Sequence, residues 1–374
     1  MGMRRIRQLK GVDEIPIDGV EFSIRDDKCL IVKFRERSPC LSSAVLNGGF
    51  KTARAIANYQ VSEEFSSGNP KAFLRRALRR LKVPGPAVGL MTAADVNKFS
   101  LKIEKREGIS VCAIATAGVS NAASAGDEIP RNWSLGTINV IILVGARLSK
   151  GCMVDAVKTA TEAKVMALMD LDVRSKFSGD AASGTTTDAI AVACTNRGES
   201  LSYAGTGATL GVLVGRAVRA SVKEAVQRQD FPRGRLPTSR LEERGITLRR
   251  MGNALLEYSP ALRSWSGLKV EKLIERALAD VNVSSLIMAG ARLDEDVAKG
   301  LTRRVDGGLN RLVADEILGS AIANYMAGSR GVREFFALRQ AKPPSLDGLK
   351  PLARGAIEGM LAGIRSKIEV KGEE

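Results

Sequence analysis

The stretch QDFPRGRLPTSRLEER, residues 229–244, decides the fold because the character of the sequence changes across it. The stretch is polar and basic, and two prolines and a glycine interrupt it, which is typical of a linker between domains. A chain of 374 residues is also longer than one hydrophobic core supports, since such cores stop growing at about 250–300 residues. We therefore predict two domains, residues 1–228 and 245–374, joined by a linker at 229–244.

The sequence before this linker favours strands. Short apolar or alternating runs, separated by glycine, proline and asparagine, fit the length and period of β-strands. Examples are CLIVKF (residues 29–34), CLSSAVL (40–46) and TINVIILVGA (137–146). Helical patterns are expected at residues 73–81, 153–169 and 210–228. Strand clusters mixed with a few helices predict an α+β domain with a mixed, largely antiparallel sheet.

The sequence after the linker favours helices throughout. Apolar residues recur there at helical spacing, for example in LKVEKLIERALADV (residues 268–281) and LARGAIEGMLAGIRSKI (352–368). No strand-like alternation interrupts them. We therefore predict an all-α domain at the C-terminal end.

The composition limits the chemistry. Histidine is absent, which excludes Ser-His triads, Cys-His dyads and histidine-bearing zinc sites. The five cysteines are scattered through apolar segments without CxxC spacing, so we expect buried free thiols. Catalysis must therefore use carboxylates, hydroxyls, thiols, lysine or a hard cation on oxygen ligands.

Charge and hydropathy bear on partners and location. The net charge of +16 raises nucleic acid as a partner, but aromatic residues make up only 4% of the chain and no sustained basic tract occurs. We predict no nucleic-acid partner, with a basic nucleic-acid binder as a rival interpretation. No apolar run reaches the roughly 18 residues of a membrane span, and the first residues lack the apolar core of a signal peptide. We expect a cytoplasmic protein.

Several blocks before the linker resemble one family. They are LSSAVLNGG (residues 41–49), GLMTAADV (89–96), TAGVSNAASAGD (116–127), GTINVIILVGARLS (136–149), TATEAKVMAL (159–168) and SGDAASGTTTDAI (178–190). In this order they resemble the adenosylcobinamide amidohydrolases of the CbiZ type. The resemblance implies that adenosylcobinamide is the substrate, and that its aminopropanol amide is hydrolysed to adenosylcobyric acid and (R)-1-aminopropan-2-ol.

Residue type and block position suggest a candidate site for this reaction. Amide hydrolysis needs an activated water or nucleophile and hydrogen-bond donors for the oxyanion. We take Glu162, Asp188 and Asp127 as candidate catalytic acids or bases. The candidate substrate-binding side chains are Asn47, Asn121, Asn139, Ser183, Thr185, Thr186 and Thr187. The last four belong to a loop of small residues, which we expect to form one wall of a corrinoid pocket. No cofactor is predicted for this domain.

These residues also have structural alternatives. Glu162 can pair with Lys158 or Lys164 on its helix, Asp188 can end a turn, and the threonines at 185–187 can be satisfied by backbone groups.

Two further alternatives change the chemistry. A corrinoid-binding or sensing protein without hydrolysis would bind adenosylcobinamide and release no product. Self-cleavage before a threonine would expose an N-terminal nucleophile without any histidine. The glycine-threonine steps that allow it are Gly136-Thr137, Gly184-Thr185 and Gly205-Thr206.

Blocks after the linker resemble a second family. LADVNVSSLIMAGARLDED (residues 278–296), LVADEILGSAIANYMAGSRG (312–331) and KPPSLDGLKPLARGAIEGMLAG (342–363) resemble the archaeal α-ribazole-5′-phosphate phosphatases of the CobZ type. With both halves, the chain resembles the bifunctional cobamide-salvage proteins of the CbiS type. The resemblance implies α-ribazole 5′-phosphate as a second substrate. Adjacent carboxylates on a mainly apolar helix, Asp315 and Glu316, are candidate Mg²⁺ ligands.

Departures from the second family leave alternatives open. Arg339 and Arg354 stand where acidic residues are expected, and with Lys342 they suit binding of a phosphate anion without its cleavage. A degenerate phosphatase is therefore an alternative unless Asp347 or Glu358 substitutes for the missing acids. The acidic pair on the apolar helix can also form a solvated face or pair with arginines.

Overall fold

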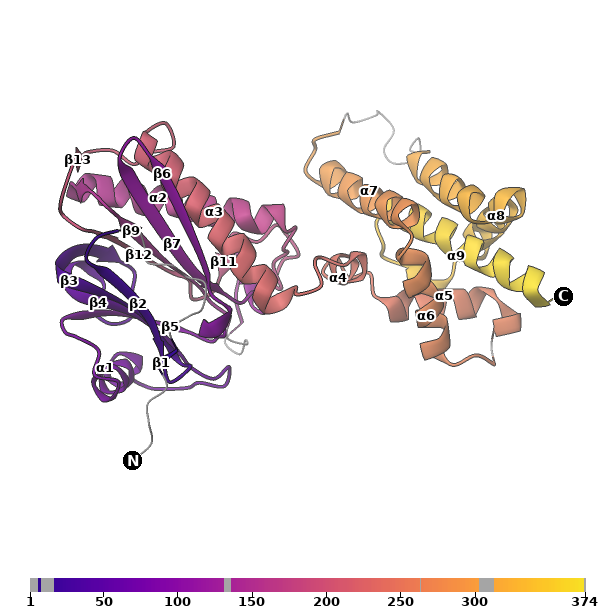
Figure 1. The fold of residues 1–374 in the computed structure, drawn as a ribbon. Helices are drawn as coiled ribbons and strands as arrows, with labels where there is room; N and C mark the ends of the chain where they lie inside the picture. The colour runs from indigo at the N-terminus through magenta and orange to yellow at the C-terminus, as the bar shows by residue number, and fades with distance from the viewer. Residues whose placement is uncertain (1–5, 8–16, 131–135, 263, 303–312, 373–374) are drawn as a thin grey trace. The chain divides into compact units, whose positions relative to one another are not determined.

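The computed structural model describes residues 6–7, 17–130, 136–262, 264–302 and 313–372. The chain forms two compact units, Met1–Gly234 and Arg235–Glu374 (Figure 1). The first is a mixed sheet with helices and the second is helical, which confirms the predicted fold classes. The stretch 229–244 spans the division between the units and itself carries the short helix α4 (Pro237–Glu242).

The first unit is built on one sheet of nine strands. The hydrogen-bonded order is β1-β2-β3-β12-β9-β7-β6, and β4 and β5 branch from β3. Two pairs, β9 with β12 and β4 with β5, are parallel, and the others are antiparallel. The strands are β1 (Ile6–Arg7), β2 (Val20–Arg25), β3 (Cys29–Ser42), β4 (Gly49–Gln60), β5 (Ala87–Thr92), β6 (Ser100–Arg106), β7 (Ile109–Ala117), β9 (Ile138–Val144) and β12 (Ala189–Cys194).

The long strand β3 lets this sheet fold over on itself. Its first half pairs with β2, whereas its end, from Cys40 to Ser42, pairs with β12. The pairing with β4 shifts register between Lys33 and Ser38, which is where the strand changes partners. Apolar residues of β3, β4 and β5 consequently pack against those of β7, β9 and β12 in a core between the two halves of the sheet.

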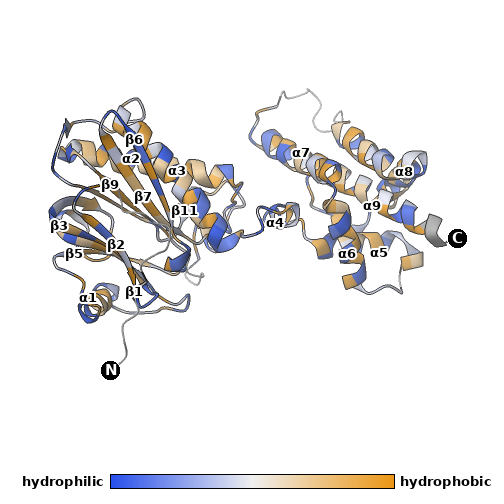
Figure 2. Cartoon of the chain, in the orientation of Figure 1, coloured by the Kyte–Doolittle hydropathy of each residue, from blue (hydrophilic) through white to orange (hydrophobic). Residues whose placement is uncertain are grey.

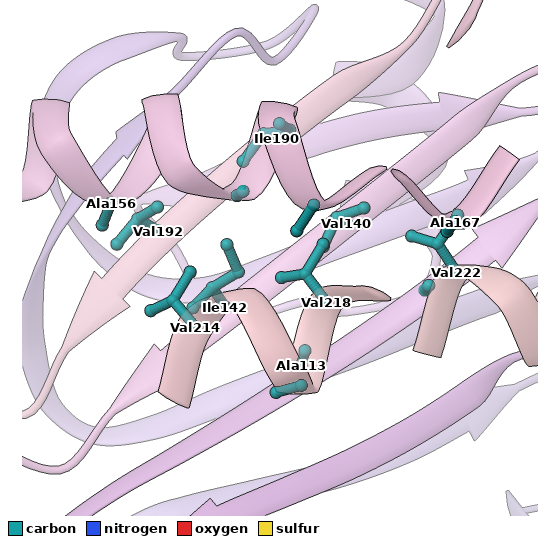
Figure 3. Close-up of a cluster of buried hydrophobic side chains, with 14 of the residues drawn as sticks. Ala113, Val140, Ile142, Ala156, Ala167, Ile190, Val192, Val214, Val218 and Val222 are labelled. Atoms are coloured by element: carbon teal, nitrogen blue, oxygen red, sulfur yellow. The ribbon is translucent and has the colours of Figure 1, made fainter. Parts of the chain in front are cut away.

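Helices cover the two outer faces of the folded sheet (Figure 1). α1 (Pro70–Arg80) packs on the β3-β4-β5 half. α2 (Lys150–Asp170) and α3 (Thr209–Asp230) pack on the other half. Figure 3 shows Val214 and Val218 of α3 beside Ile142 and Val140 of β9, and Val222 beside Ala167 of α2. Alternation along β9 thus puts one set of side chains under the helices and the other set between the sheet halves.

Short elements complete the first unit. They are η1 (Val96–Lys98), β8 (Ala122–Ala123), β10 (Arg147–Leu148), β11 (Gly184–Thr185) and β13 (Ser200–Leu201). Strands β8 and β11 pair antiparallel and hold residues 183–188, here called the hydroxyl-rich loop, against the segment after β7. All five cysteines are buried free thiols, as expected, and burial raises the pKa of Cys112 to about 12.

The second unit is a bundle of helices around its own core. Figure 2 shows hydrophobic residues on the inner faces of these helices and polar residues outside. No helix in the described part of the chain is long and apolar enough to cross a membrane. The helices after α4 are α5 (Leu248–Tyr258), η2 (Pro260–Leu262), α6 (Gly267–Leu278), α7 (Val281–Ala298), α8 (Ala314–Ala341), η4 (Pro344–Leu346) and α9 (Pro351–Gly372).

Helix α8 is in fact two arms that fold back on each other. The turn is at Ala327 and Gly328, and Gly328 has φ 59° and ψ −150°, a conformation that glycine adopts most readily. The arms and α9 approach closely at glycines. A Cβ on Gly319 would lie 2.3 Å from the Phe335 ring and 2.4 Å from the carbonyl oxygen of Gly355. The fold-back brings the end of α8 beside its beginning.

Candidate active site

The candidate site lies where the parallel strands β9 and β12 begin side by side. Ala189 is opposite Asn139 in their register, so two residues earlier Thr187 lies beside Thr137. Their hydroxyl oxygens are 2.7 Å apart. Alternation turns the next residue of the loop, Asp188, to the opposite face, towards helix α2. The loop from Gly184 to Asp188 therefore offers polar groups on both faces of the sheet.

Asp188 is the centre of the hydrogen bonding on the α2 side. Its carboxylate accepts bonds from the ammonium of Lys164 and from the hydroxyl of Thr185. It also accepts from the backbone N–H groups of Ile138 and Thr185, each at 3.0 Å. The side chains of Lys164 and Asp188 are only 10% and 12% exposed, so this is a nearly buried ion pair with further donors. A Cβ on Gly184 would lie 2.3 Å from Asp188 Oδ2, so glycine permits the close approach.

Hydroxyl groups line the other side of the same loop. Thr187 donates to the carbonyl oxygen of Gly136 at 2.9 Å, and the hydroxyl oxygen of Thr185 lies 3.2 Å from that carbonyl oxygen. The amide of Asn121 donates to the Thr186 hydroxyl at 2.6 Å. The site thus gathers the three threonines of the loop around the Gly136 carbonyl and the Asn121 amide.

Asn139 belongs to a polar chain that crosses the core between the sheet halves. Its amide nitrogen donates to Asn58 and to the carbonyl oxygen of Met91, each at 2.8 Å. Asn58 in turn donates to the Thr116 hydroxyl at 2.8 Å. Asn139 lies on the same face of β9 as Thr137, two residues further on. The structure therefore places Asn139 next to the site, where it ties β9 to β5.

Asp127 and Ser183 tie the hydroxyl-rich loop to its neighbours. Asp127 accepts from the backbone N–H of Ser124 at 2.7 Å and from the Ser175 hydroxyl, and Ser183 accepts from the Ala125 N–H at 2.9 Å. Burial opposes ionisation of Asp127, but these hydrogen bonds outweigh it and lower the pKa of the carboxyl. A carboxylate held ionised in this way suits a structural acceptor better than a general base near neutral pH.

Two other predicted residues lie outside this cluster. Asn47 has φ 56° in the turn between β3 and β4 and donates to the carbonyl oxygen of Ala87 at 2.7 Å. Glu162 is exposed on α2. It is two residues, about 200° of helical rotation, from Lys164, so it faces away from Asp188.

Lys164 is the functional candidate that the sequence analysis named only as a partner for Glu162. It pairs with Asp188 instead, while Lys158 pairs with Asp155 at 3.1 Å. A signal for this role is present in the sequence, because Lys164 falls one turn after Ala160 on the buried face of α2. A lysine in an otherwise apolar stripe requires a buried acidic partner.

The arrangement can support acyl transfer. It holds a nearly buried lysine–aspartate pair on one face of the loop, and threonine hydroxyls and the Asn121 amide lie on the other face. A model of the adenosylcobinamide amidohydrolase family matches residues 15–232, which include every residue of this cluster. The chain belongs to this family. Family membership supports hydrolase activity and amide hydrolysis in cobamide salvage.

Relatives agree with this assignment. The adenosylcobinamide amidohydrolase of Methanosarcina mazei is 32% identical over 194 residues, which are 50% of this chain and 88% of that protein. An uncharacterized protein of Methanocaldococcus jannaschii is 29% identical over 240 residues, 58% of this chain and 91% of its own. The adenosylcobinamide amidohydrolase of Halobacterium salinarum is 34% identical over 124 residues, 31% of this chain and 48% of that protein.

The helical unit lies outside the residues that match the amidohydrolase family, and its polar groups form a separate cluster. Arg339 lies between two carboxylates, 2.8 Å from Asp315 and 3.4 Å from Glu358. Its distance to Glu316, which is 47% exposed, is 3.7 Å. Arg354 pairs with Glu358 at 2.8 Å. The two arginines that depart from the phosphatase pattern therefore neutralise buried acids instead of facing an open anion site.

The residues of this cluster do not fit a bridging Mg²⁺. A metal on the predicted ligands Asp315 and Glu316 would have to share them with the Arg339 guanidinium, which lies 2.8 Å from Asp315 and 3.7 Å from Glu316. Among the residues that the structure describes, no group of three or more acidic or thiol side chains is arranged to hold a metal ion. Lys342 is exposed in a left-handed conformation at the end of α8, and Asp347 is exposed 3.4 Å from Arg354.

Burial makes ionisation of this cluster costly. Glu358 is 2% exposed, and burial raises the pKa of its carboxyl, although Arg354 and Arg339 act in the opposite direction. Burial also raises the pKa of Asp294, whose carboxylate caps α9 by accepting from the N–H groups of Leu352 and Ala353. We therefore expect Arg339 and Arg354 to stabilise the helical unit by pairing with Glu358.

Proposed function

We propose that this amidohydrolase-family chain hydrolyses the aminopropanol amide of adenosylcobinamide, releasing adenosylcobyric acid and (R)-1-aminopropan-2-ol. Family membership and the Methanosarcina mazei relative support the substrate. The observation that carries the proposal is the nearly buried Lys164–Asp188 pair, whose aspartate bonds to the Thr185 hydroxyl and belongs to the same loop as the Thr187 hydroxyl. It supplies, without histidine, the groups that amide hydrolysis requires.

The hydrogen bonds indicate different roles for Asp188 and Lys164. Asp188 already accepts from four donors, so its part is to hold Lys164 and the Thr185 hydroxyl in place and not to take up a substrate proton. The ammonium of Lys164 carries three protons, of which one bonds to Asp188, so it can stabilise developing negative charge. The hydroxyls of Thr137 and Thr187 are the candidate nucleophiles, and the Asn121 amide is a further donor.

The experiment that tests this proposal is a product assay. Purified protein is incubated with adenosylcobinamide, and the products are identified by chromatography with mass detection. We expect adenosylcobyric acid and aminopropanol in equal amounts. Bound cobinamide without product would support the corrinoid-sensing alternative. A protein that does not bind adenosylcobinamide and does not hydrolyse it would overturn the proposal.

A second proposal concerns the helical unit. Its resemblance to α-ribazole-5′-phosphate phosphatases suggests dephosphorylation of α-ribazole 5′-phosphate with Mg²⁺. The contact of Arg339 with both Asp315 and Glu358 favours the degenerate alternative, in which this metal-dependent reaction is lost. We expect no release of phosphate from α-ribazole 5′-phosphate with Mg²⁺ or with a chelator. Phosphate release that requires Mg²⁺ would contradict this proposal and restore the bifunctional assignment.

A further inference from the structure

The peptide bond between Gly136 and Thr137 lies inside the hydroxyl cluster. The hydroxyl oxygen of Thr137 is 2.7 Å from that of Thr187, and Thr187 donates to the carbonyl oxygen of Gly136 at 2.9 Å. Each hydroxyl carries one proton. Because Thr187 gives its proton to the carbonyl, it must accept the proton of Thr137. Two hydrogen bonds therefore connect the Thr137 hydroxyl, through Thr187, to the Gly136 carbonyl oxygen, and both donate in that direction.

A second observation comes from Asn121. Its side chain is 1% exposed, and its Oδ1 atom has no hydrogen-bond partner among the described residues. A Cβ on Gly136 would lie only 2.2 Å from this oxygen, so the oxygen points at the same peptide. Leaving a buried acceptor unpaired costs free energy. An amine released beside Gly136 would supply the missing donor.

Thr185 links this peptide to the Lys164–Asp188 ion pair. The Thr185 hydroxyl oxygen lies 3.2 Å from the Gly136 carbonyl oxygen and donates to Asp188, which holds Lys164. The donor at the Gly136 carbonyl oxygen is the Thr187 hydroxyl, and a hydrogen bond to that oxygen stabilises a tetrahedral intermediate at its carbon.

We infer that the Gly136–Thr137 bond is a self-cleavage site. The hydroxyl oxygen of Thr137 bonds to the Gly136 carbonyl carbon, its proton passes to Thr187, and the Thr187 proton passes to the carbonyl oxygen. The carbon–nitrogen bond then breaks and the nitrogen takes back that proton, which leaves an ester and a free amine on Thr137. Water hydrolyses the ester to the Gly136 carboxylate and the Thr137 hydroxyl.

The inference deepens the proposed function and rests on it in one respect, the later use of Thr137. Its freed α-amine can serve as the base for its own hydroxyl, which then attacks the substrate amide. Of the other glycine-threonine steps, Gly184-Thr185 lacks a free hydroxyl proton. The hydroxyl of Thr185 already bonds to Asp188.

The test is the mass of the purified wild-type chain under denaturing conditions. Denaturation is needed because β9 pairs with β7 and β12, which would hold the fragments together. We expect two fragments whose masses sum to the intact chain plus one water, the second beginning with the residues Thr137-Ile138-Asn139. Full-length chain alone, after prolonged incubation, would overturn the inference.

Variants identify the groups that act. T137A stays full-length, T137S is cleaved, and T187V is cleaved about a hundredfold more slowly. T161A is the matched control, because the exposed Thr161 hydroxyl donates to the carbonyl oxygen of Val157 in its own helix, and we expect this variant to be cleaved like wild type. Cleavage of T137A would contradict the assignment of Thr137.

Cleavage and turnover are scored separately. A full-length chain that hydrolyses adenosylcobinamide would overturn self-cleavage and leave the proposed function intact. Fragments that do not hydrolyse it would support self-cleavage and count against the proposed function.

Discussion

We expect that replacing Asp188 with asparagine lowers kcat for the proposed hydrolysis of adenosylcobinamide at least about a hundredfold. The carboxylate accepts from Lys164, from the Thr185 hydroxyl and from the N–H groups of Thr185 and Ile138. An asparagine has one acceptor oxygen, and its NH₂ group would face one or more of these donors. Lys164 would also lose the charge that holds it. The measurement is steady-state kinetics with adenosylcobinamide, and we expect KM to change much less than kcat.

Asp155→Asn is the matched control for this prediction. Asp155 also lies on α2 and pairs with Lys158. The side chains of this pair are partly exposed, and an ion pair near the solvent contributes little to stability. We expect turnover within about twofold of wild type. Glu162→Gln should behave like this control because Glu162 is exposed and faces away from Asp188. Equal losses in Asp188→Asn and Glu162→Gln would contradict the roles drawn from the structure.

Much of the fold follows from local pattern, but the path of the sheet does not. The runs at 29–34 and 40–46 predict two strands, whereas β3 continues from Cys29 to Ser42. The charged residues between the runs suggest a break, and in the structure a shift of register bends the strand there instead. The exchange of partners from β2 to β12 depends on contacts between distant segments, which no local pattern encodes.

Part of the candidate site could likewise be predicted from the sequence, and part of it could not. Composition points to the loop with Thr185, Thr187 and Asp188, since hydroxyl and carboxyl groups concentrate there next to an apolar strand. The importance of Lys164 is hidden because its partner lies 24 residues away and reaches it only after α2 packs on the sheet. Glu162 has the residue type that catalysis needs, and only its position on the helix separates it from the site.

We expect that replacing Arg339 with methionine lowers the unfolding free energy of the helical unit. The guanidinium bonds to Asp315 and Glu358, whose side chains are 11% and 2% exposed. Methionine keeps much of the length of arginine but leaves two buried acids near each other with one cation fewer. Removing one partner of a buried ion pair costs about 3–5 kcal/mol of unfolding free energy. Urea titration followed by circular dichroism should show an earlier transition.

Arg333→Met is the matched control, because Arg333 is exposed on the same arm of α8. Its unfolding free energy should stay within about 0.5 kcal/mol of wild type. Losses of similar size in the two variants would mean that the effect comes from helix α8 in general and not from the buried acids.

The pH dependence of the stability loss in Arg339→Met distinguishes the effect of the Arg339 charge from the effect of its packing. Burial already raises the pKa of Glu358, and the arginines lower it, so loss of Arg339 raises it further above the ordinary value of 4.5. A carboxyl with a raised pKa favours the folded state while it is protonated, and this stability is lost as the pH rises through the folded-state pKa. The difference in unfolding free energy between wild type and variant should therefore be largest near neutral pH and shrink as the pH falls towards 4.5. A loss that stays constant over this range would assign Arg339 a packing role, since the contacts of its side chain with the Phe335 ring do not titrate.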